Sequence, residues 1–274
     1  MSLNRIKLFD QFISESSISI KDPGSAGDVF AGVIAGHKNI KEEPKGSNTG
    51  NMVNQYLASV GLGPGLPWCA AFVYYVFDQF TKRLGVKNEL PKTGGCMNHW
   101  ERADKNLKIP IADVKSNPSL VKPGQIFIMT RPGKGLGHTG IVIDVDPQRR
   151  EFISIEGNTN DQSSGEGDRV GVNRRKIDSS RFVGFIDYFK GSRTPEFEKE
   201  LRTAIDKSKI PLAPLSNQSA SPSDAVVSGY GEELGNLKTK PAGFMAKILS
   251  GVHSTVTGKL AQPEEIQAQI DKLR

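Results

Sequence analysis

Cys69 has the residue type and the sequence context of a catalytic nucleophile. Pro67 and Trp68 precede it, and two alanines followed by apolar residues on every turn come after it. This pattern predicts a buried helix that begins at or just before the cysteine. Unpaired backbone N–H groups and the positive end of the helix dipole favour the thiolate, which attacks carbonyl carbon. The alternative is a small buried hydrophobe, and the helix by itself leaves both interpretations open.

A base for this thiol is predicted at His138, which stands between Gly137 and Thr139 at the start of an apolar strand. The next predicted strand leads into Glu156 and Asn158. If the two strands are adjacent and antiparallel, Glu156 and Asn158 lie near the level of His138, where they can accept its ring N–H and select the tautomer. The pairing register is an assumption, because a slip of one residue would turn Glu156 to the opposite face.

The elements that must position these residues change in type along the chain. Helical periodicity is found first, and after Pro123-Gly124 short runs rich in Ile, Val and Phe alternate with turn residues. Helices followed by strands favour an α+β fold with an antiparallel sheet that closes near Gly191. The predicted helices are 26–40, 51–60, 69 to about 81 and 95–104, and the predicted strands are 125–129, 139–144, 151–156, 170–174 and 182–189.

Composition limits the class of protein. The chain has 274 residues, 36% hydrophobic and 24% charged, as expected for a globular protein with a polar remainder. The net charge of +6 suggests an acidic partner. The short basic clusters Arg149-Arg150 and Arg174-Arg175-Lys176 are interpreted as solvated hairpin ends, and no aromatics alternate with them, which argues against nucleic acid. No window is apolar enough to span a bilayer, and the first ten residues do not resemble a secretory signal.

The two cysteines, Cys69 and Cys96, are too few for a disulfide framework. They could pair with each other, but a nucleophile must stay reduced. Cys96 and His99 have a spacing that could suit a metal, but a second ligand pair is missing, so a helix surface is the preferred interpretation and no metal or other cofactor is expected. Asp161 and Asp168 could bind substrate amines or a cation, although solvated loop acids are more common.

Taken together, these motifs resemble the CHAP domain. The resemblance rests on Pro-Trp-Cys-Ala-Ala-Phe on a helix, a Lys-Pro-Gly turn into a strand, Gly-His-x-Gly-Ile-Val and Glu-x-Asn, in that order. It implies a papain-like fold related to the NlpC group, in which a helix carrying the nucleophile packs on a C-terminal antiparallel sheet. It implies a cysteine- and histidine-dependent amidohydrolase or peptidase that cuts peptidoglycan. Carried over to this chain, it implies Cys69 as nucleophile, His138 as general base and acid, and Glu156 with Asn158 as the orienting groups.

Two further residues are weaker candidates for substrate binding. Trp68 is predicted to wall the cleft, with a core aromatic as the alternative. Asn48, in the loop before the second helix, could reach the cleft, with a helix cap as the alternative.

The expected domain organisation is an N-terminal arm at 1–25, a CHAP-like catalytic domain at 26–191 and a linker with a helical extension at 192–274. Within the extension, residues 195–207 are predicted to form a charged helix, 210–224 have the Pro and Ser content of a linker, and 263–273 form an amphipathic helix. The extension is expected to dock on a partner, on delivery machinery or on a second copy of the chain. A weakly ordered extension is the alternative.

Without an export signal, a wall hydrolase must stay inside the cell, leave through a phage holin as an endolysin does, or be injected by a secretion system such as type VI. In the last two cases its target is the periplasmic or extracellular wall, and an antibacterial effector would need an immunity protein. Two alternative functions remain: a catalytically silent binding or structural module of the same fold, and a cysteine enzyme acting on a protein or lipid amide.

Overall fold

The computed structural model describes residue 18 and residues 23–130, 137–160 and 167–208, all within one compact unit, Met1–Ala213. Most of the predicted arm, Asp161, the predicted linker at 210–224 and the predicted helix at 263–273 lie outside the described residues. The α-helices in chain order are α2 (Pro23–Ala35), α3 (Asn51–Ser59), α4 (Cys69–Leu84), α5 (Cys96–Arg102), α6 (Ile111–Ser116) and α7 (Pro195–Lys207). Two short 3₁₀ turns, η1 (Pro118–Leu120) and η2 (Lys190–Ser192), complete the helical elements.

The strands form one antiparallel six-stranded sheet in the order β1-β6-β2-β3-β4-β5. Their bounds are β1 (Lys108–Pro110), β2 (Ile126–Thr130), β3 (Gly137–Asp146), β4 (Glu151–Thr159), β5 (Arg169–Lys176) and β6 (Phe182–Ile186). Because helices α2 to α5 precede the main strands, the predicted α+β class is confirmed, and the arrangement is consistent with a papain-like fold.

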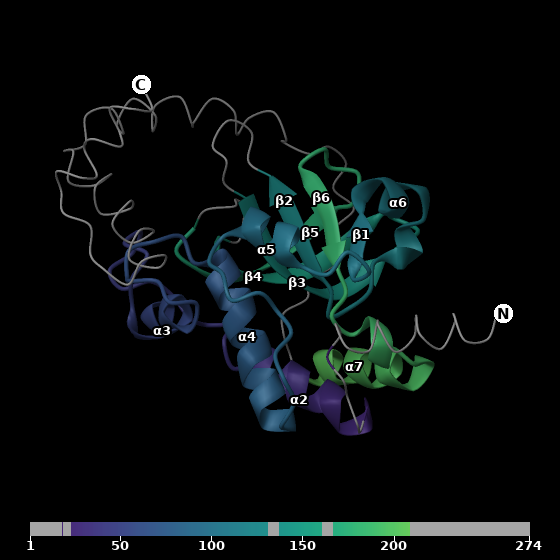
Figure 1. Cartoon of the computed structure of the whole chain (residues 1–274), viewed down its shortest axis with the longest axis horizontal. Helices are drawn as coiled ribbons and strands as arrows, with labels where there is room; N and C mark the ends of the chain where they lie inside the picture. The colour runs from purple at the N-terminus through teal and green to yellow at the C-terminus, as the bar shows by residue number, and fades with distance from the viewer. Residues whose placement is uncertain (1–17, 19–22, 131–136, 161–166, 209–274) are drawn as a thin grey trace. The chain divides into compact units, whose positions relative to one another are not determined.

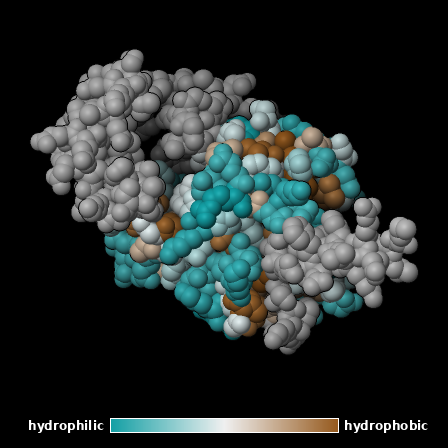
Figure 2. All heavy atoms as spheres, viewed as in Figure 1, coloured by the Kyte–Doolittle hydropathy of each residue, from teal (hydrophilic) through white to brown (hydrophobic). Residues whose placement is uncertain are grey.

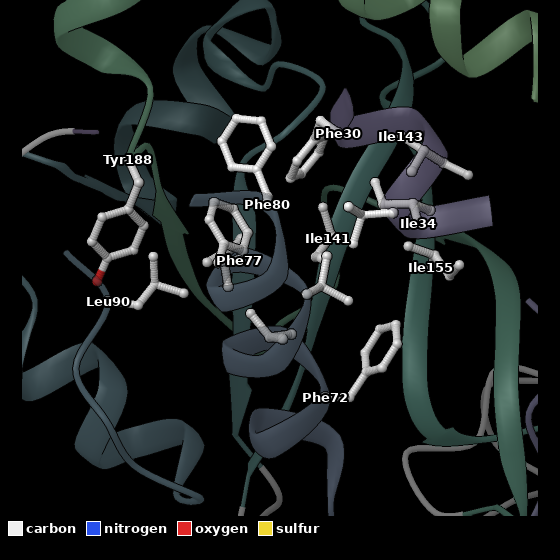
Figure 3. Close-up of a cluster of buried hydrophobic side chains, with 14 of the residues drawn as sticks. Phe30, Ile34, Phe72, Phe77, Phe80, Leu90, Ile141, Ile143, Ile155 and Tyr188 are labelled. Carbon is white, nitrogen blue, oxygen red and sulfur yellow. The ribbon is translucent and has the colours of Figure 1, made fainter. Parts of the chain in front are cut away.

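The hydrophobic core lies between α4 and the sheet. Helix α4 runs alongside β3 and β4, and α2 crosses α4 with α7 next to it (Figure 1). The aromatic side chains of α2 and α4 meet edge to face, as Phe30 does with both Phe77 and Phe80. Isoleucines from β3 and β4 complete the cluster from the sheet side (Figure 3). Burial of this apolar area fixes the position of α4 against the sheet.

Several element boundaries differ from the predicted ones for local reasons. Helix α2 ends at Ala35, five residues early, because the following N–H groups of His37 and Lys38 bond three residues back and tighten the chain into a turn. Helix α4 continues to Leu84, where Gly85 takes the left-handed conformation with φ 65°. Strand β6 ends at Ile186, because the Asp187 carboxylate accepts the Phe189 N–H in a turn.

Three short elements between α5 and β2 were not predicted. Strand β1 has three residues, α6 has six and η1 has three. Segments this short contain less than two periods of a helix or strand pattern, so hydrophobic periodicity cannot detect them.

Helix α7 begins and ends where the sequence predicts, at Pro195 and Lys207. It lies beyond the predicted domain boundary at Gly191, yet it buries an apolar stripe in the main core: Phe197, Leu201, Ala204 and Ile205. Gly27 of α2 permits this contact, since a Cβ there would lie 2.8 Å from the Leu201 backbone nitrogen. The packing extends the core past residue 191, while the boundary itself stays a prediction.

The exposed surface is largely hydrophilic. On the face shown in Figure 2, hydrophobic residues occur in small separate patches. Leu120 is the exposed large hydrophobic residue among those described. No helix within the described part of the chain is long and apolar enough to cross a membrane.

Candidate active site

The thiol of Cys69 lies at the very start of α4, as predicted. Trp68 occupies the N-cap position without a side-chain cap, and its carbonyl accepts the Phe72 N–H as the first helical bond. Because no side chain caps this terminus, the helix dipole acts directly on the thiol. Cys69 is free of any disulfide and only 4% exposed.

The assumed pairing of the histidine strand with the following strand is confirmed. Strands β3 and β4 are adjacent and antiparallel, with Ile141 opposite Ile155. His138 and Gly140 alternate onto one face, and a Cβ on Gly140 would lie 2.6 Å from Cγ of Glu156. The glycine therefore leaves the space through which the Glu156 side chain reaches His138. His138 Nε2 lies 2.8 Å from Glu156 Oε2, with both side chains fully buried.

Strand β4 also comes very close to the first turn of α4. A Cβ on Gly157 would lie 2.5 Å from Cβ of Phe72 and 2.8 Å from Cζ3 of Trp68. Only glycine permits this approach, which brings the end of β4 to the helix terminus that carries Cys69.

His138 interacts with both Cys69 and Glu156. Burial lowers the pKa of its imidazole, but contacts with Cys69 and Glu156 outweigh burial and raise that pKa above its ordinary value. Glu156 occupies Nε2, while Nδ1 is buried and makes no hydrogen bond of standard geometry within the described part of the chain. Nδ1 is therefore the nitrogen available to exchange a proton with the Cys69 thiol.

The Glu156 carboxylate accepts hydrogen bonds from residues that sequence reasoning missed. Ser154 donates to Oε1, Asn173 donates to Oε2, and Arg175 donates to both oxygens. Burial raises the pKa of this carboxyl, but Arg175 and the hydrogen bonds lower it well below its usual range. Glu156 is therefore a carboxylate oriented to accept the Nε2–H of His138.

The interpretation of Arg175 as part of a solvated basic cluster is wrong. Its side chain is 7% exposed and packs over the ring of Phe127. Arg175 and Asn173 are two residues apart on β5, opposite Phe152 and Ser154 of β4, so strand alternation points them to the same face as Glu156. The alternation is visible in the sequence. It places Asn173 and Arg175 beside Glu156 only once the β4–β5 register is known.

Asn158 is placed differently from Glu156. It is 2% exposed and has φ 55°, at the irregularity where the β4–β5 register shifts. Among the described residues its Oδ1 has no hydrogen-bond partner, and the histidine N–H goes to Glu156. Its role as a second orienting group stays a prediction.

Trp68 and Asn48 meet at a buried carboxylate, Glu42. The Trp68 indole N–H donates to Oε1 of Glu42 at 2.8 Å, and the Asn48 backbone N–H donates to Oε2 at 3.0 Å. The Trp68 ring is fully buried and stacks on Tyr56, which fits the core-aromatic alternative. Asn48 is half-buried, and Gly50 is the residue at the N-cap of α3, so Asn48 does not cap that helix. Substrate contact by either residue stays a prediction.

The expectation that Cys96 and His99 lie on a helix surface is wrong, because both are buried. Cys96 Sγ lies 3.5 Å from Cys69 Sγ, and His99 Nε2 lies 3.0 Å from the Tyr188 hydroxyl. The two side chains therefore have different partners. Within the described ranges, no group of three or more His, Cys, Asp or Glu residues could hold a metal ion. Asp168 is paired with Arg169 at 2.9 Å and with Lys45 at 3.7 Å.

The fold is an antiparallel α+β arrangement consistent with a papain-like one. It places a cysteine at a helix N-terminus and a His–Glu pair on adjacent strands. This combination is typical of cysteine- and histidine-dependent acyl-transfer sites. Residues 61–158 match the family model of the CHAP domain, which is consistent with the resemblance that the motifs carry. The match covers roughly a third of the chain and includes Cys69, His138, Glu156 and Asn158. No curated protein and no solved structure matched the chain. CHAP domains generally denote cysteine- and histidine-dependent amidohydrolases or peptidases that act on peptidoglycan.

Proposed function

We propose that this protein is a cysteine hydrolase that cleaves amide bonds in bacterial peptidoglycan, as an N-acetylmuramoyl-L-alanine amidase or a peptide-stem endopeptidase. The observation that supports this proposal is the buried His138 side chain, which interacts with both Cys69 and Glu156. Since His138 contacts the thiol on one side and a fixed carboxylate on the other, it can take a proton from sulfur and return it to a leaving amine.

The proposed reaction proceeds through a thioester. The Cys69 thiolate attacks the amide carbonyl, and His138 protonates the departing amine. Water, activated by the same imidazole, then releases the acid and restores the thiol. The Cys69 backbone N–H, at the uncapped start of α4, is positioned to stabilise the oxyanion.

The biological setting is part of the proposal. A peptidoglycan substrate places the site of action in the periplasmic or extracellular wall, reached through a phage holin or a secretion system. An antibacterial effector delivered in this way would be matched by an immunity protein and a secretion-machinery partner. The predicted extension beyond residue 208 is the candidate surface for that machinery.

The direct test is incubation of the full chain with purified sacculi, followed by mass spectrometry of the released muropeptides. New L-alanine amino ends identify an amidase, and new stem or cross-bridge ends identify an endopeptidase. We expect Cys69→Ala to reduce product by at least about 10³-fold, since the nucleophile is lost. Cys96→Ser is the matched control and should retain activity.

The opposite result would assign the nucleophile to Cys96. If folded wild-type protein released no product from sacculi, the proposed function would be wrong. Screening of protein and lipid amides would then separate an enzyme with another substrate from a silent CHAP-fold module.

A further inference from the structure

Arg175 and Asn173 both reach the Glu156 carboxylate from β5, and Arg175 is the one that carries a positive charge. Its Nε and Nη2 atoms each lie 2.5 Å from a different oxygen of Glu156, which is a two-pronged contact. Its guanidinium carbon lies 5.2 Å from the ring centroid of Phe127. The Phe127 ring is in turn 6.0 Å from that of His138. Arg175 is thus held by a carboxylate on one side and an aromatic ring on the other.

The charges of the site are supplied by separate elements. Cys69 comes from α4, His138 from β3, Glu156 from β4 and Arg175 from β5. If the thiol proton moves to His138, the negative charge of the thiolate and the positive charge of the imidazolium cancel. The Glu156 carboxylate then gives the buried group a net charge of one negative. An unbalanced buried charge is costly, and Arg175 supplies the opposite charge at hydrogen-bonding distance.

We propose that Arg175 is a positioning residue for catalysis: it holds Glu156 ionised and in one orientation, so that His138 can carry the proton of Cys69. This inference deepens the proposed function, because it assigns a role beside the same nucleophile. Lysine cannot replace the two-pronged contact of the Arg175 guanidinium, since its single ammonium cannot donate in parallel to both carboxylate oxygens.

The test measures the thiol directly. The full chain is alkylated with iodoacetamide at a series of pH values, and the rate is followed on the Cys69 peptide by mass spectrometry. In wild type we expect fast alkylation to persist at acidic pH, where Glu156 is still ionised. In Arg175→Gln the acid limb of the profile should move to higher pH by about one unit or more, because Glu156 loses its cation and becomes protonated more readily.

Conservative and control variants separate positioning from folding. Arg175→Lys, which keeps the charge, should fall between wild type and Arg175→Gln. Arg174→Gln alters the preceding arginine, which pairs with Glu151 at 3.2 Å, and should keep the wild-type profile. On sacculi, Arg175→Lys should lower kcat more than it changes KM. A merely structural role would reduce the folded fraction without moving the profile of the folded protein.

Unchanged profiles in Arg175→Gln and Arg175→Lys would overturn the proposal. If Arg175→Gln does not fold because Glu156 is left unpaired, the double variant Glu156→Gln/Arg175→Gln removes both charges. A wild-type acid limb in that folded double variant would overturn the proposal equally. Because alkylation needs no substrate, failure of sacculus cleavage would refute the proposed function without deciding this inference.

A second, independent observation concerns the two sulfur atoms. Cys69 and Cys96 are the first residues of α4 and α5, and their Sγ atoms are 3.5 Å apart in the reduced state. Ala70 packs with both cysteines in one small buried cluster. A disulfide requires a separation of about 2.05 Å, so the two sulfurs must approach each other by about 1.5 Å to bond.

We also infer that Cys96 is a resolving thiol that protects the nucleophile against peroxide. Hydrogen peroxide oxidises the Cys69 thiolate to a sulfenic acid and releases hydroxide. The Cys96 thiol then attacks that sulfur, a disulfide forms and water leaves. Two electrons have passed from the two thiols to peroxide, and an added dithiol returns them. The protein is inactive while the disulfide persists.

The measurement is the intact mass of the full chain after brief exposure to hydrogen peroxide. Wild type should lose two hydrogen atoms, and dithiothreitol should restore both thiols and Cys69 alkylation. Cys96→Ser should instead gain oxygen at Cys69 and lose alkylation irreversibly. Added oxygen at Cys69 in wild type, at the same rate as in Cys96→Ser, would overturn the inference. These readouts do not depend on the substrate of the protein.

Discussion

The Glu156 side chain is held in place by several other buried polar groups. Glu156 accepts hydrogen bonds from His138, Ser154, Asn173 and Arg175 at one carboxylate. A carboxylate with so many donors cannot rotate without breaking several bonds, so the orientation of His138 is fixed from behind. The proposed catalytic arrangement therefore also depends on Ser154, Asn173 and Arg175, which contact Glu156.

Another buried histidine links stability to pH. Burial and the nearby Arg102 lower the pKa of His99 to about 4 from its ordinary value of 6.5. Between these values the unfolded chain binds a proton that the folded protein does not, so stability should fall as pH decreases from 6.5 towards 4. The loss attributable to His99 should be up to about 3 kcal/mol. Urea unfolding at several pH values measures it.

His99→Gln keeps a polar partner for Tyr188 but does not titrate, so its unfolding free energy should vary less over this pH range. Glu156 contributes at lower pH, since its pKa is shifted downward. An equal slope in His99→Gln and wild type would show that other groups account for the acid sensitivity.

At the scale of elements, the site depends on the contact of one helix terminus with two strands. Gly140 gives Glu156 its route to His138, and Gly157 lets β4 approach the first turn of α4. Neither glycine needs a positive φ angle, so each is required for space and not for its backbone conformation.

Gly157→Ala should therefore separate β4 from α4. Its Cβ would lie within 3 Å of both Phe72 and Trp68, so the strand must shift. We expect a stability loss of about 1–3 kcal/mol and a larger proportional loss of Cys69 alkylation at neutral pH. Gly32→Ala, in α2, is the control, because nothing lies within 4 Å of its Cβ and alanine favours the helix. Wild-type behaviour of Gly157→Ala in chemical unfolding and alkylation would contradict the proposed close docking.

At the scale of the whole molecule, the folded unit includes helix α7, which lies beyond the predicted domain boundary at Gly191. Helix α7 buries four apolar side chains in the core, and the Arg193–Asp187 pair at 2.6 Å ties the segment before it to the end of β6. The helix therefore contributes to the same core as α2 and α4, although it follows the sheet by several residues.

Two truncations test this contribution. A chain ending at Gly191 loses α7 and should lose about 6 kcal/mol or more of stability, comparable with the total for many domains, so cooperative unfolding should disappear. A chain ending at Ala213 keeps the compact unit that includes α7 and should retain cooperative unfolding. Equal thermal unfolding of both truncated chains would show that α7 is dispensable and would support a boundary at 191.

Local patterns were sufficient to predict the α+β class, the helix that begins at Cys69, the strand that begins near His138 and the bounds of α7. These predictions succeed because apolar periodicity, proline and glycine act over a few residues. The Glu156 prediction needed one further assumption, the β3–β4 pairing, which the structure confirms.

Tertiary structure alone decided which polar groups became buried together. The basic cluster that includes Arg175 was predicted to be solvated, and the short helix that includes Cys96 was predicted to place it on the surface. Both interpretations fail because burial depends on strand register and helix packing between residues distant in sequence. The sequence by itself thus predicted Cys69 and His138 as nucleophile and base and placed them on the correct elements, whereas only the packing of α5 and β5 brought Cys96 to the thiol and Arg175 to the carboxylate.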